Sequence, residues 1–304
     1  MSKNPHPKNR YASIKARLLD IARERGVDYN TLTRLYFQER FLDRLSKSRY
    51  SENLYLKGAL LFMAYEMTPG RLTQDIDFLA NDIKNESSEL RKIFTEILSI
   101  DIDDCVSFNS TDIKIDPIIA GGVQNGVRIF FRCSLDNIKG RLQIDLGFGD
   151  VILKDPVKLQ FPVILKEFDK PDVLAYRIET ALAEKFEAIV TLHLLNSRMK
   201  DFYDIIFIAS NFKLTLGSIS ESINATFVKR GTKLENSRRI FEARFKRNPE
   251  MQTQWNAFLS RKKLQFEINF EVVVTQIESF LKPCIDEPES DAVWNPEAFM
   301  WEKL

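Results

Sequence analysis

Histidine and cysteine are scarce, and this scarcity excludes several kinds of site. The 304-residue chain has two histidines and three cysteines, Cys105, Cys133 and Cys284, which lie far apart in the sequence. No CxxC pair occurs, and an odd number of cysteines cannot form a complete set of disulfides. We therefore expect a reducing, cytoplasmic environment. Zinc sites built on several histidines are excluded, and zinc sites on clustered cysteines are disfavoured.

Long apolar runs and an excess of charge of one sign are also missing. No stretch approaches the roughly 18 consecutive apolar residues that a membrane span needs, and residues 1–10 are polar, without the apolar core of a signal peptide. We predict no membrane span. The 44 basic and 43 acidic residues give a net charge of +1. A nucleic-acid contact would therefore need a local basic patch rather than a global charge.

The first half of the chain mixes helical and strand-like periodicity. The expected helices and strands are residues 11–26, 30–46, 53–57, 59–67, 75–80, 87–98, 113–119, 127–133 and 141–148. Glycine and Asn-Gly in residues 121–126 predict a hairpin turn between two of these strands, and residues 137–140 predict the next turn. This order is typical of a mostly antiparallel or mixed sheet with helices on one side, an α+β core.

After Pro156 the pattern becomes mainly helical. Residues 162–165 are the last expected strand, and the chain looks helical from Asp172 onward. Helices are expected at residues 174–195, 199–210, 216–225 and 234–247, with two or three more after residue 250. These patterns divide the chain into an N-terminal helical segment (1–50), a core (51–165) and a mainly helical C-terminal domain (166–304).

One stretch of the core combines glycine, a helix break and paired carboxylates. A short apolar run ends at Lys57 and Gly58, an apolar helical segment follows, and residues 69–70 (Pro-Gly) end it. Asp75 and Asp77 then lie one residue apart in a second apolar run, where a strand places both on one face. Two such carboxylates are costly without a positive partner. Mg²⁺ ions that bridge to substrate phosphates are the expected occupants.

Asp145, on the strand expected at residues 141–148, is the candidate for a third carboxylate. Three carboxylates repel one another unless cations neutralise them, and this ligand set suits two-metal phosphoryl or nucleotidyl transfer. A turn residue at a strand end is the structural alternative for Asp145, and Asp116 is a less favoured third carboxylate. The Asp-x-Asp within residues 101–104 has no upstream glycine turn, so we interpret it as a solvated loop.

Two charged residues interrupt apolar helical stripes. All the neighbours of Lys185 at helical spacing are apolar, so its ammonium needs an anion such as a triphosphate; the alternative is a lysine that extends to solvent. Asp201 also lies on an apolar face, where it can pair with Lys185, contact a base or ribose, or cap a helix. Lys57 and Gly58 end a strand and begin a helix, where phosphate can approach backbone N–H groups.

A basic segment admits two interpretations. Its eight cations are Lys229, Arg230, Lys233, Arg238, Arg239, Arg244, Lys246 and Arg247. Phe227, Phe241 and Phe245 interleave with them, a composition that suits contact with a nucleic-acid backbone, although a solvated helix face explains such runs more often. His193, the only histidine outside the N-terminal tail, is expected to pack half-buried on a helix.

Taken in order, these motifs resemble the AbiEii-type nucleotidyltransferase toxins of type IV toxin–antitoxin and abortive-infection systems, which include the MenT toxins. The resemblance covers roughly residues 10–210, and the matching segments are Glu39–Leu45, Leu56–Ala59, Arg71–Phe78, Ile144–Gly147, Glu179–Lys185 and Arg198–Ile205. The family often has a second glycine, or in the wider superfamily a serine, where this chain has Ala59. Alanine keeps the tight packing but loses a hydroxyl contact to phosphate.

The resemblance implies a polymerase-β-like nucleotidyltransferase core, a mixed sheet with flanking helices, followed by a helical C-terminal domain. It implies that Asp75 and Asp77 hold Mg²⁺, with two ions expected and Asp145 beside them. Lys185 is then expected to contact the nucleotide phosphates and Asp201 to complete the catalytic site.

The same resemblance implies substrates and partners. Lys57, Gly58, Thr73 and Lys185 are the expected nucleotide-binding residues. Characterised relatives add nucleotides to the 3′ end of tRNA, which blocks translation. The expected partners are therefore an NTP, a tRNA or other RNA acceptor, and a genetically paired antitoxin that forms no stable complex. A protein or small-molecule acceptor, or a catalytically silent nucleotide-binding module, are the alternatives.

Overall fold

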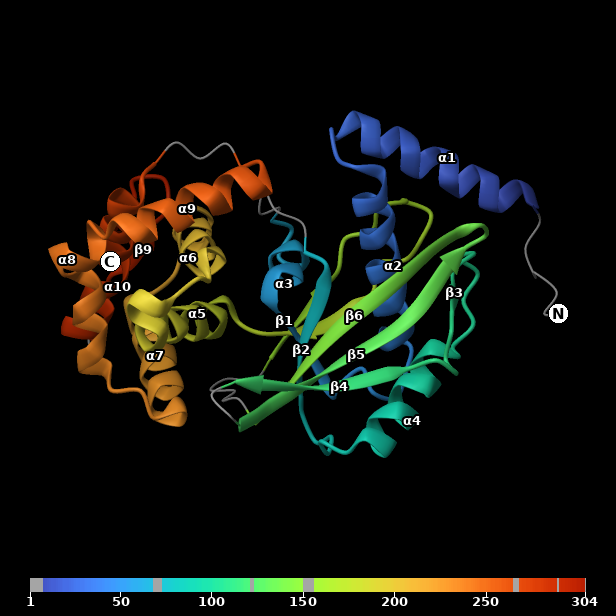
Figure 1. Cartoon of the computed structure of the whole chain (residues 1–304), viewed down its shortest axis with the longest axis horizontal. Coiled ribbons are helices and arrows are strands. Elements are labelled where there is room, and N and C mark those ends of the chain that lie inside the picture. The colour runs from blue at the N-terminus through green and yellow to red at the C-terminus, as the bar shows by residue number, and fades with distance from the viewer. Residues whose placement is uncertain are drawn as a thin grey trace. The chain divides into compact units, whose positions relative to one another are not determined.

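The computed structural model describes residues 8–67, 73–120, 123–149, 156–264, 268–288 and 290–303. Its described residues up to Ala175 form one compact unit, and those from Tyr176 onward form a second (Figure 1). The three-part domain division stays a prediction. Among the described residues, no helix has both the length and the apolar character needed to cross a membrane.

The first unit is built on an eight-stranded mixed sheet with the order β3-β5-β6-β2-β1-β8-β7, and β4 pairs with β5 (Figure 1). Its strands are β1 (Leu54–Lys57), β2 (Asp75–Ala80), β3 (Ser107–Phe108), β4 (Lys114–Ala120), β5 (Val123–Leu135), β6 (Ile138–Phe148), β7 (Val157–Gln160) and β8 (Asp172–Ala175). Strand β2 runs parallel to β6, and β8 runs parallel to β1. The sheet is thus mixed, as predicted.

Helices α2 and α4 cover one face of this sheet. The helices of the first unit are α1 (Lys8–Glu24), α2 (Tyr29–Ser46), α3 (Gly58–Ala64) and α4 (Ser87–Leu98). The Phe41 ring of α2 lies 6.4 Å from Phe78 of β2, 5.6 Å from Phe131 of β5 and 6.2 Å from Phe94 of α4, measured between ring centroids. This aromatic cluster fixes α2 against the middle of the sheet, with its apolar stripe turned inward.

The opposite face of the sheet carries the polar residues of β2 and β6. Ile76, Phe78, Ile144 and Leu146 are fully buried under the helices. Because successive side chains of a strand point to opposite faces, the residues between them point away from that core. Asp75, Asp77 and Asp145 therefore stand on the open face, where each is partly exposed.

Helix α2 also buries charged side chains. Arg44 donates to both carboxylate oxygens of Asp104, at 2.6 and 3.1 Å, and Arg40 pairs with Glu39 at 2.5 Å and with Asp43 at 3.2 Å. Burial raises the pKa of Glu39 to about 7, against the lowering effects of Arg40 and of a backbone N–H. The prediction of a solvated loop at residues 101–104 is therefore wrong for Asp104, which is 1 % exposed.

The second unit is mainly helical. Its elements are α5 (Ile178–Leu192), the short 3₁₀ helix η1 (His193–Leu195), α6 (Met199–Asn211), α7 (Leu216–Arg230), the 3₁₀ helix η2 (Leu234–Phe241), α8 (Ala243–Lys246), α9 (Pro249–Lys262), α10 (Phe270–Asp286), β9 (Val293–Asn295) and β10 (Met300–Glu302). Local signals set several ends: Asn248 caps the start of α9, and Gly231, at φ +67°, ends α7. Trp294 of β9 packs against Phe280 of α10.

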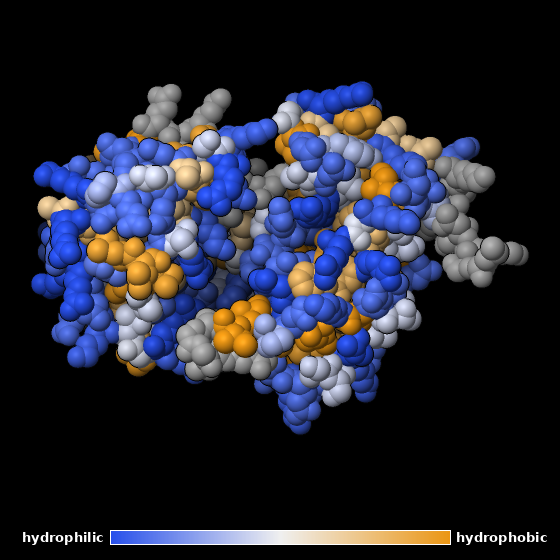
Figure 2. All heavy atoms as spheres, in the orientation of Figure 1, coloured by the Kyte–Doolittle hydropathy of each residue, from blue (hydrophilic) through white to orange (hydrophobic). Residues whose placement is uncertain are grey.

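Exposed large hydrophobic side chains are scattered along the described residues. They are Ile119, Leu195, Val228, Val272 and Met300. Figure 2 shows a mainly hydrophilic face in the orientation of Figure 1. Singly exposed apolar residues of this kind are ordinary for a folded chain.

Several sequence-based assignments differ from the structure. Residues 162–165 are not a strand; the strand is β7, which ends just before Pro162, a residue without a backbone donor. Residues 172–175 are strand β8 rather than the start of helical structure, because Val173 and Ala175 alternate into the core. The helix expected at 234–247 is two short pieces, η2 and α8. The hairpin β9–β10 was not predicted.

The hairpin of β4 and β5 forms as predicted, but not all of its predicted turn residues are in a turn. Residues 121–122 lie outside the described residues, whereas Gly126 lies within β5 and pairs with Gly147 of β6. A Cβ atom at Gly126 would lie 2.5 Å from the carbonyl oxygen of Leu146. Glycine at this position therefore permits a close approach of two strands rather than a turn.

Candidate active site

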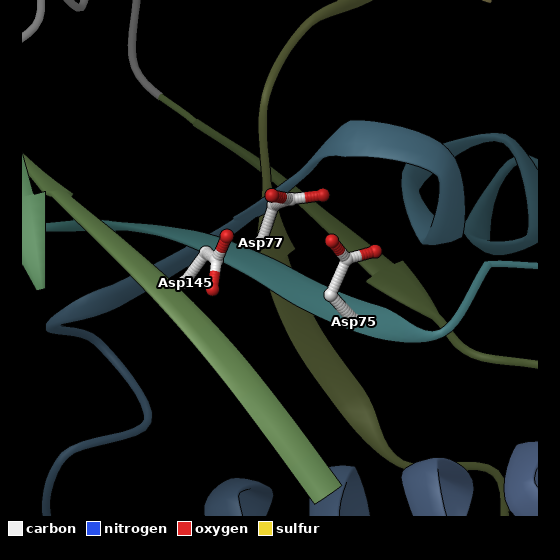
Figure 3. Close-up of side chains that lie close together, drawn as sticks. All are labelled: Asp75, Asp77 and Asp145. Atoms are coloured by element: carbon white, nitrogen blue, oxygen red, sulfur yellow. The ribbon is translucent and has the colours of Figure 1, made fainter. Parts of the chain in front are cut away.

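Three carboxylates converge where β2 and β6 run side by side. In the register of this parallel pair, Asp77 stands opposite Asp145 and Asp75 stands opposite Gln143. Figure 3 shows the three aspartate side chains gathered on the same side of the two strands. One oxygen from each carboxylate lies within 4.8 Å of the other two. Among the residues that the structure describes, this is the one group of His, Cys, Asp and Glu side chains assembled closely enough to hold a metal.

The donor set of this carboxylate cluster fits a divalent metal. All three ligands are carboxylate oxygens, which hard cations such as Mg²⁺ and Ca²⁺ prefer. Without a cation, three carboxylates at this separation repel one another in a partly buried setting. The cluster can therefore bind a divalent metal at Asp75 and Asp77, the two residues at which the sequence pattern predicts one.

Asp145 is held by two neighbours on the same face of the sheet. Arg128 of β5, directly opposite in the antiparallel register, donates from Nε to Oδ1 at 2.8 Å and from its terminal nitrogen to Oδ2 at 2.6 Å. Gln143 Nε2 also donates to Oδ1, at 3.0 Å. The hydrogen bond to Asp145 raises the pKa of Arg128, and the charges of Asp75 and Asp77 act in the same direction. Sequence reasoning did not identify Arg128.

Asp75 and Asp77 are placed by residues from the same predicted motif. The Thr73 hydroxyl donates to Asp75 Oδ1, and Gln38 of α2 donates to the Asp75 backbone carbonyl at 3.4 Å. Gly58, at φ +69°, lies so close to Asp77 that a Cβ atom would come within 2.0 Å of Asp77 Oδ2. The absence of a Cβ atom at Gly58 thus leaves room for the Asp77 side chain. The approach of a phosphate to the backbone at Gly58 stays a prediction. Lys57 is the ladder partner of Asp77.

The predicted residues Lys185 and Asp201 belong to the second unit, on α5 and α6. Lys185 Nζ lies 2.6 Å from Asp204 Oδ2 and 3.7 Å from Asp201 Oδ1, and Arg198 Nε lies 2.8 Å from Asp201 Oδ2. The side chains of Asp201 and Asp204 are 1 % and 0 % exposed, and that of Lys185 is 12 % exposed. This geometry favours a paired Lys185 over one that extends to solvent.

Asp204, the nearer anion, was not predicted as a site residue. Its signal was present in the sequence, because it lies three residues after Asp201 on the same apolar face of the helix. Neither carboxylate oxygen of Asp201 accepts a hydrogen bond, so Asp201 caps no backbone N–H of the helix, and it forms an ion pair with Arg198 instead. Of the alternatives for Asp201, the structure thus favours ion pairing over capping.

The basic segment of residues 229–247 is largely neutralised within the second unit. Five of its eight cations pair with carboxylates: Arg230 with Glu184 and Glu187, Lys233 with Glu235, Arg238 with Asp286, Lys246 with Glu278, and Arg247 with Glu271. Phe227 and Phe245 are 1 % exposed and belong to the core. These pairs favour the solvated, ion-paired face over a nucleic-acid track. His193 packs on Phe245, with ring centroids 5.1 Å apart and partial burial, as predicted.

Comparison with known proteins gives a consistent result. Residues 40–276 match the family described as nucleotidyl transferase AbiEii toxin, type IV TA system. Two solved structures share the fold with a TM-score of 0.51 and 14 % sequence identity: JHP933 from Helicobacter pylori, covering 86 % of this chain and 94 % of that one, and the nucleotidyltransferase toxin MenT4 from Mycobacterium tuberculosis H37Rv, covering 91 % and 99 %. No curated protein matches the chain. The family match spans more than half of the sequence, and the chain therefore belongs to the AbiEii nucleotidyltransferase toxins of type IV toxin–antitoxin systems.

Proposed function

We propose that this nucleotidyltransferase is Mg²⁺-dependent and transfers a nucleoside monophosphate from an NTP to an RNA acceptor, the 3′ end of tRNA, and that this transfer blocks translation. The observation that carries the proposal is the convergence of Asp75, Asp77 and Asp145 on the open face of the sheet. Membership of the toxin family supports the nucleotidyl chemistry and the toxic outcome. The acceptor is the part of the proposal that an experiment must decide.

In the proposed reaction, the 3′-hydroxyl of the acceptor attacks the α-phosphorus of the NTP. A new P–O bond forms, the bond between the α-phosphorus and the bridging oxygen breaks, pyrophosphate leaves, and the proton of the attacking hydroxyl passes to solvent. Two Mg²⁺ ions held by Asp75, Asp77 and Asp145 would neutralise the charge on the attacking and leaving oxygens. The chain contributes by positioning, because Thr73 fixes the carboxylate of Asp75 and Gly58 leaves room for that of Asp77.

We further propose that Lys185 contacts the nucleotide phosphates and that Asp201 completes the catalytic site, with Lys57, Gly58 and Thr73 contributing to nucleotide binding. An ammonium has three N–H donors. Asp204 accepts one from Lys185 at 2.6 Å, and Asp201 is 3.7 Å away. The ion pair with Asp204 would hold the ammonium in one place before the nucleotide arrives.

The test is to incubate the protein with Mg²⁺, total RNA and each of the four NTPs, radiolabelled at the α-phosphate. RNA, protein and small molecules are then separated. We expect label in the tRNA fraction with one or more NTPs, and none with Asp77→Asn. Asp112→Asn is the matched control, because Asp112 is an exposed aspartate that pairs with Arg132 at 2.6 Å. Label in protein or in a small molecule would show that this molecule, and not tRNA, is the acceptor. Absence of label in every fraction would contradict the proposed nucleotidyl transfer.

The toxin family implies an antitoxin encoded with this protein. We propose that the antitoxin acts without forming a stable complex. Co-expression of the two proteins followed by size-exclusion chromatography tests this point. Separate elution with restored growth is expected, and co-elution at a stable ratio would overturn it.

A further inference from the structure

The carboxylate of Asp145 has few lone pairs left for a metal. A carboxylate oxygen offers two lone pairs. Both lone pairs of Oδ1 are used, since Arg128 Nε donates to this atom at 2.8 Å and Gln143 Nε2 donates at 3.0 Å. Oδ2 accepts one hydrogen bond, from Arg128 at 2.6 Å. One lone pair of Oδ2 is therefore the free coordination position that these bonds leave on Asp145.

We propose that Arg128 is a positioning residue that fixes the Asp145 carboxylate as a one-oxygen metal ligand beside Asp75 and Asp77. The planar guanidinium engages both carboxylate oxygens at once, so it sets the rotation of the carboxylate as well as its place. Partners of this kind orient metal ligands and change metal affinity when they are removed. The proposal rests on the proposed function, because it assigns Asp145 a role in holding the metal.

The register of the sheet supports this role over an incidental surface pair. Arg128 is the direct antiparallel partner of Asp145, and Asp145 is in turn the direct parallel partner of Asp77. Three adjacent strands thus place Arg128, Asp145 and Asp77 in one row on the open face. The side chain of Asp145 is 16 % exposed, whereas that of Arg128 is 41 % exposed. The ligand is shielded while the residue that orients it remains at the surface.

The test measures metal binding directly, without any turnover. Mn²⁺ is titrated into the full-length protein, and free Mn²⁺ is followed by electron paramagnetic resonance. We expect Arg128→Ala to raise the Kd for Mn²⁺ by about 10- to 100-fold. Arg128→Lys should show an intermediate increase, because an ammonium keeps the charge but cannot engage both oxygens in a fixed plane.

Arg132→Ala and Arg132→Lys are the matched controls. Arg132 lies four residues further along β5 on the same face and pairs with the exposed Asp112 at 2.6 Å. These variants should bind Mn²⁺ as the wild type does. Thermal unfolding reports whether each variant folds. If Arg128→Ala does not fold, the comparison of Arg128→Lys with Arg132→Lys decides the question.

The activity readout separates positioning from a general structural defect. With Arg128→Ala, nucleotidyl transfer should be lost at low Mg²⁺ and regained at high Mg²⁺, which a misfolded site would not show. Mn²⁺ binding by Arg128→Ala as tight as, or tighter than, that of the wild type would overturn the proposal, as would absence of Mn²⁺ binding by the wild type. If Mn²⁺ binding depends on Arg128 but no acceptor is labelled, the proposed function fails and the role of Arg128 stands.

Discussion

The two polar clusters of this protein, one in each unit, differ in how their charges are balanced. In the first unit, the three clustered aspartates share neighbouring ladder positions with Arg128 and Lys57, and all three are partly exposed. In the second unit, Lys185 and Arg198 face Asp201 and Asp204, and both of these aspartates are almost fully buried. A partly exposed excess of negative charge suits a cation from outside. The buried set balances its charges internally, although neither carboxylate oxygen of Asp201 accepts a hydrogen bond.

This difference has an energetic consequence. Removing a carboxylate from the first cluster relieves repulsion, so folding should tolerate the change while activity should not. Removing one partner from the second cluster takes an ion pair away from a buried charge, so folding itself should suffer. Variants of the two clusters therefore separate function from stability, and they should do so in opposite ways.

The largest expected effect is that of Asp75→Asn on nucleotidyl transfer. The amide keeps the shape of the side chain but removes the charge that a metal needs, so the rate should fall by about 10³-fold or more. The free energy of unfolding should change by less than about 1 kcal/mol, because the site is partly exposed. Transfer of label and thermal unfolding measure the two quantities. If this variant retains the wild-type rate, the carboxylate cluster of the first unit is not needed for catalysis and the comparison fails.

Lys185→Met should combine a loss of activity with a loss of stability. Asp204 would lose its ion pair with Lys185 at 2.6 Å while it stays buried, which costs about 3–5 kcal/mol of unfolding free energy. The double variant Lys185→Met/Asp204→Asn removes both charges and should recover most of that stability. It should not recover nucleotidyl transfer. Recovery of transfer by the double variant would show that Lys185 acts on folding alone and not on the nucleotide.

Gly58→Ala sharpens the account of the first cluster. The added Cβ would lie 2.0 Å from Asp77 Oδ2, and φ is +69°. We expect a loss of about 1–2 kcal/mol from backbone strain, together with weakened metal binding because Asp77 must move. Gly26→Ala is the control, since Gly26 has φ +62° and nothing within 4 Å of the added Cβ. It should lose similar stability and keep full activity; equal activity in both variants would argue against crowding at Asp77.

The last expected effect concerns stability alone, namely its pH dependence through Glu39. Burial raises its pKa from 4.5 to about 7, so the folded state holds its proton more tightly than the unfolded chain. The resulting stabilisation is fully present below pH 4.5 and is lost as the pH rises through about 7. Relative to Glu39→Gln, the wild type should lose on the order of 1–3 kcal/mol over this range. Denaturant unfolding of both proteins at several pH values measures it, and a constant difference would refute it.

The sequence was informative where a local period determines the structure. The span of β2 and the shared face of Asp75 and Asp77 follow from the alternation of a strand, and the span of α4 follows from its helical stripe. Asp145 lies beside Asp75 and Asp77 only because β6 is the neighbour of β2 in the sheet. The sequence alone does not predict which strands are neighbours, so it made Asp145 a candidate and no more. The family resemblance supplied the remaining expectation.

Arg128 was missed because its position depends on register. The hairpin of β5 and β6 turns at Asp136 and Asn137, with Leu135 paired to Ile138, and this pairing brings Arg128 opposite Asp145. The turn predicted at residues 137–140 leaves the register undefined, and a shift of one residue moves every side chain to the other face. Strand β8 was not predicted because it has only four residues and directly precedes a helix. Four residues are too few for the apolar pattern to distinguish a strand from the start of a helix.

The most direct test of the account is to locate the metal itself. A crystal of the protein soaked in Mn²⁺ should show an anomalous scattering peak bound by oxygens of Asp75, Asp77 and Asp145. The same experiment with Asp75→Asn should show that peak weakened or gone. A wild-type crystal with Mn²⁺ bound elsewhere, and no peak at these three aspartates, would contradict the central claim that the open face of this sheet is a metal-dependent active site.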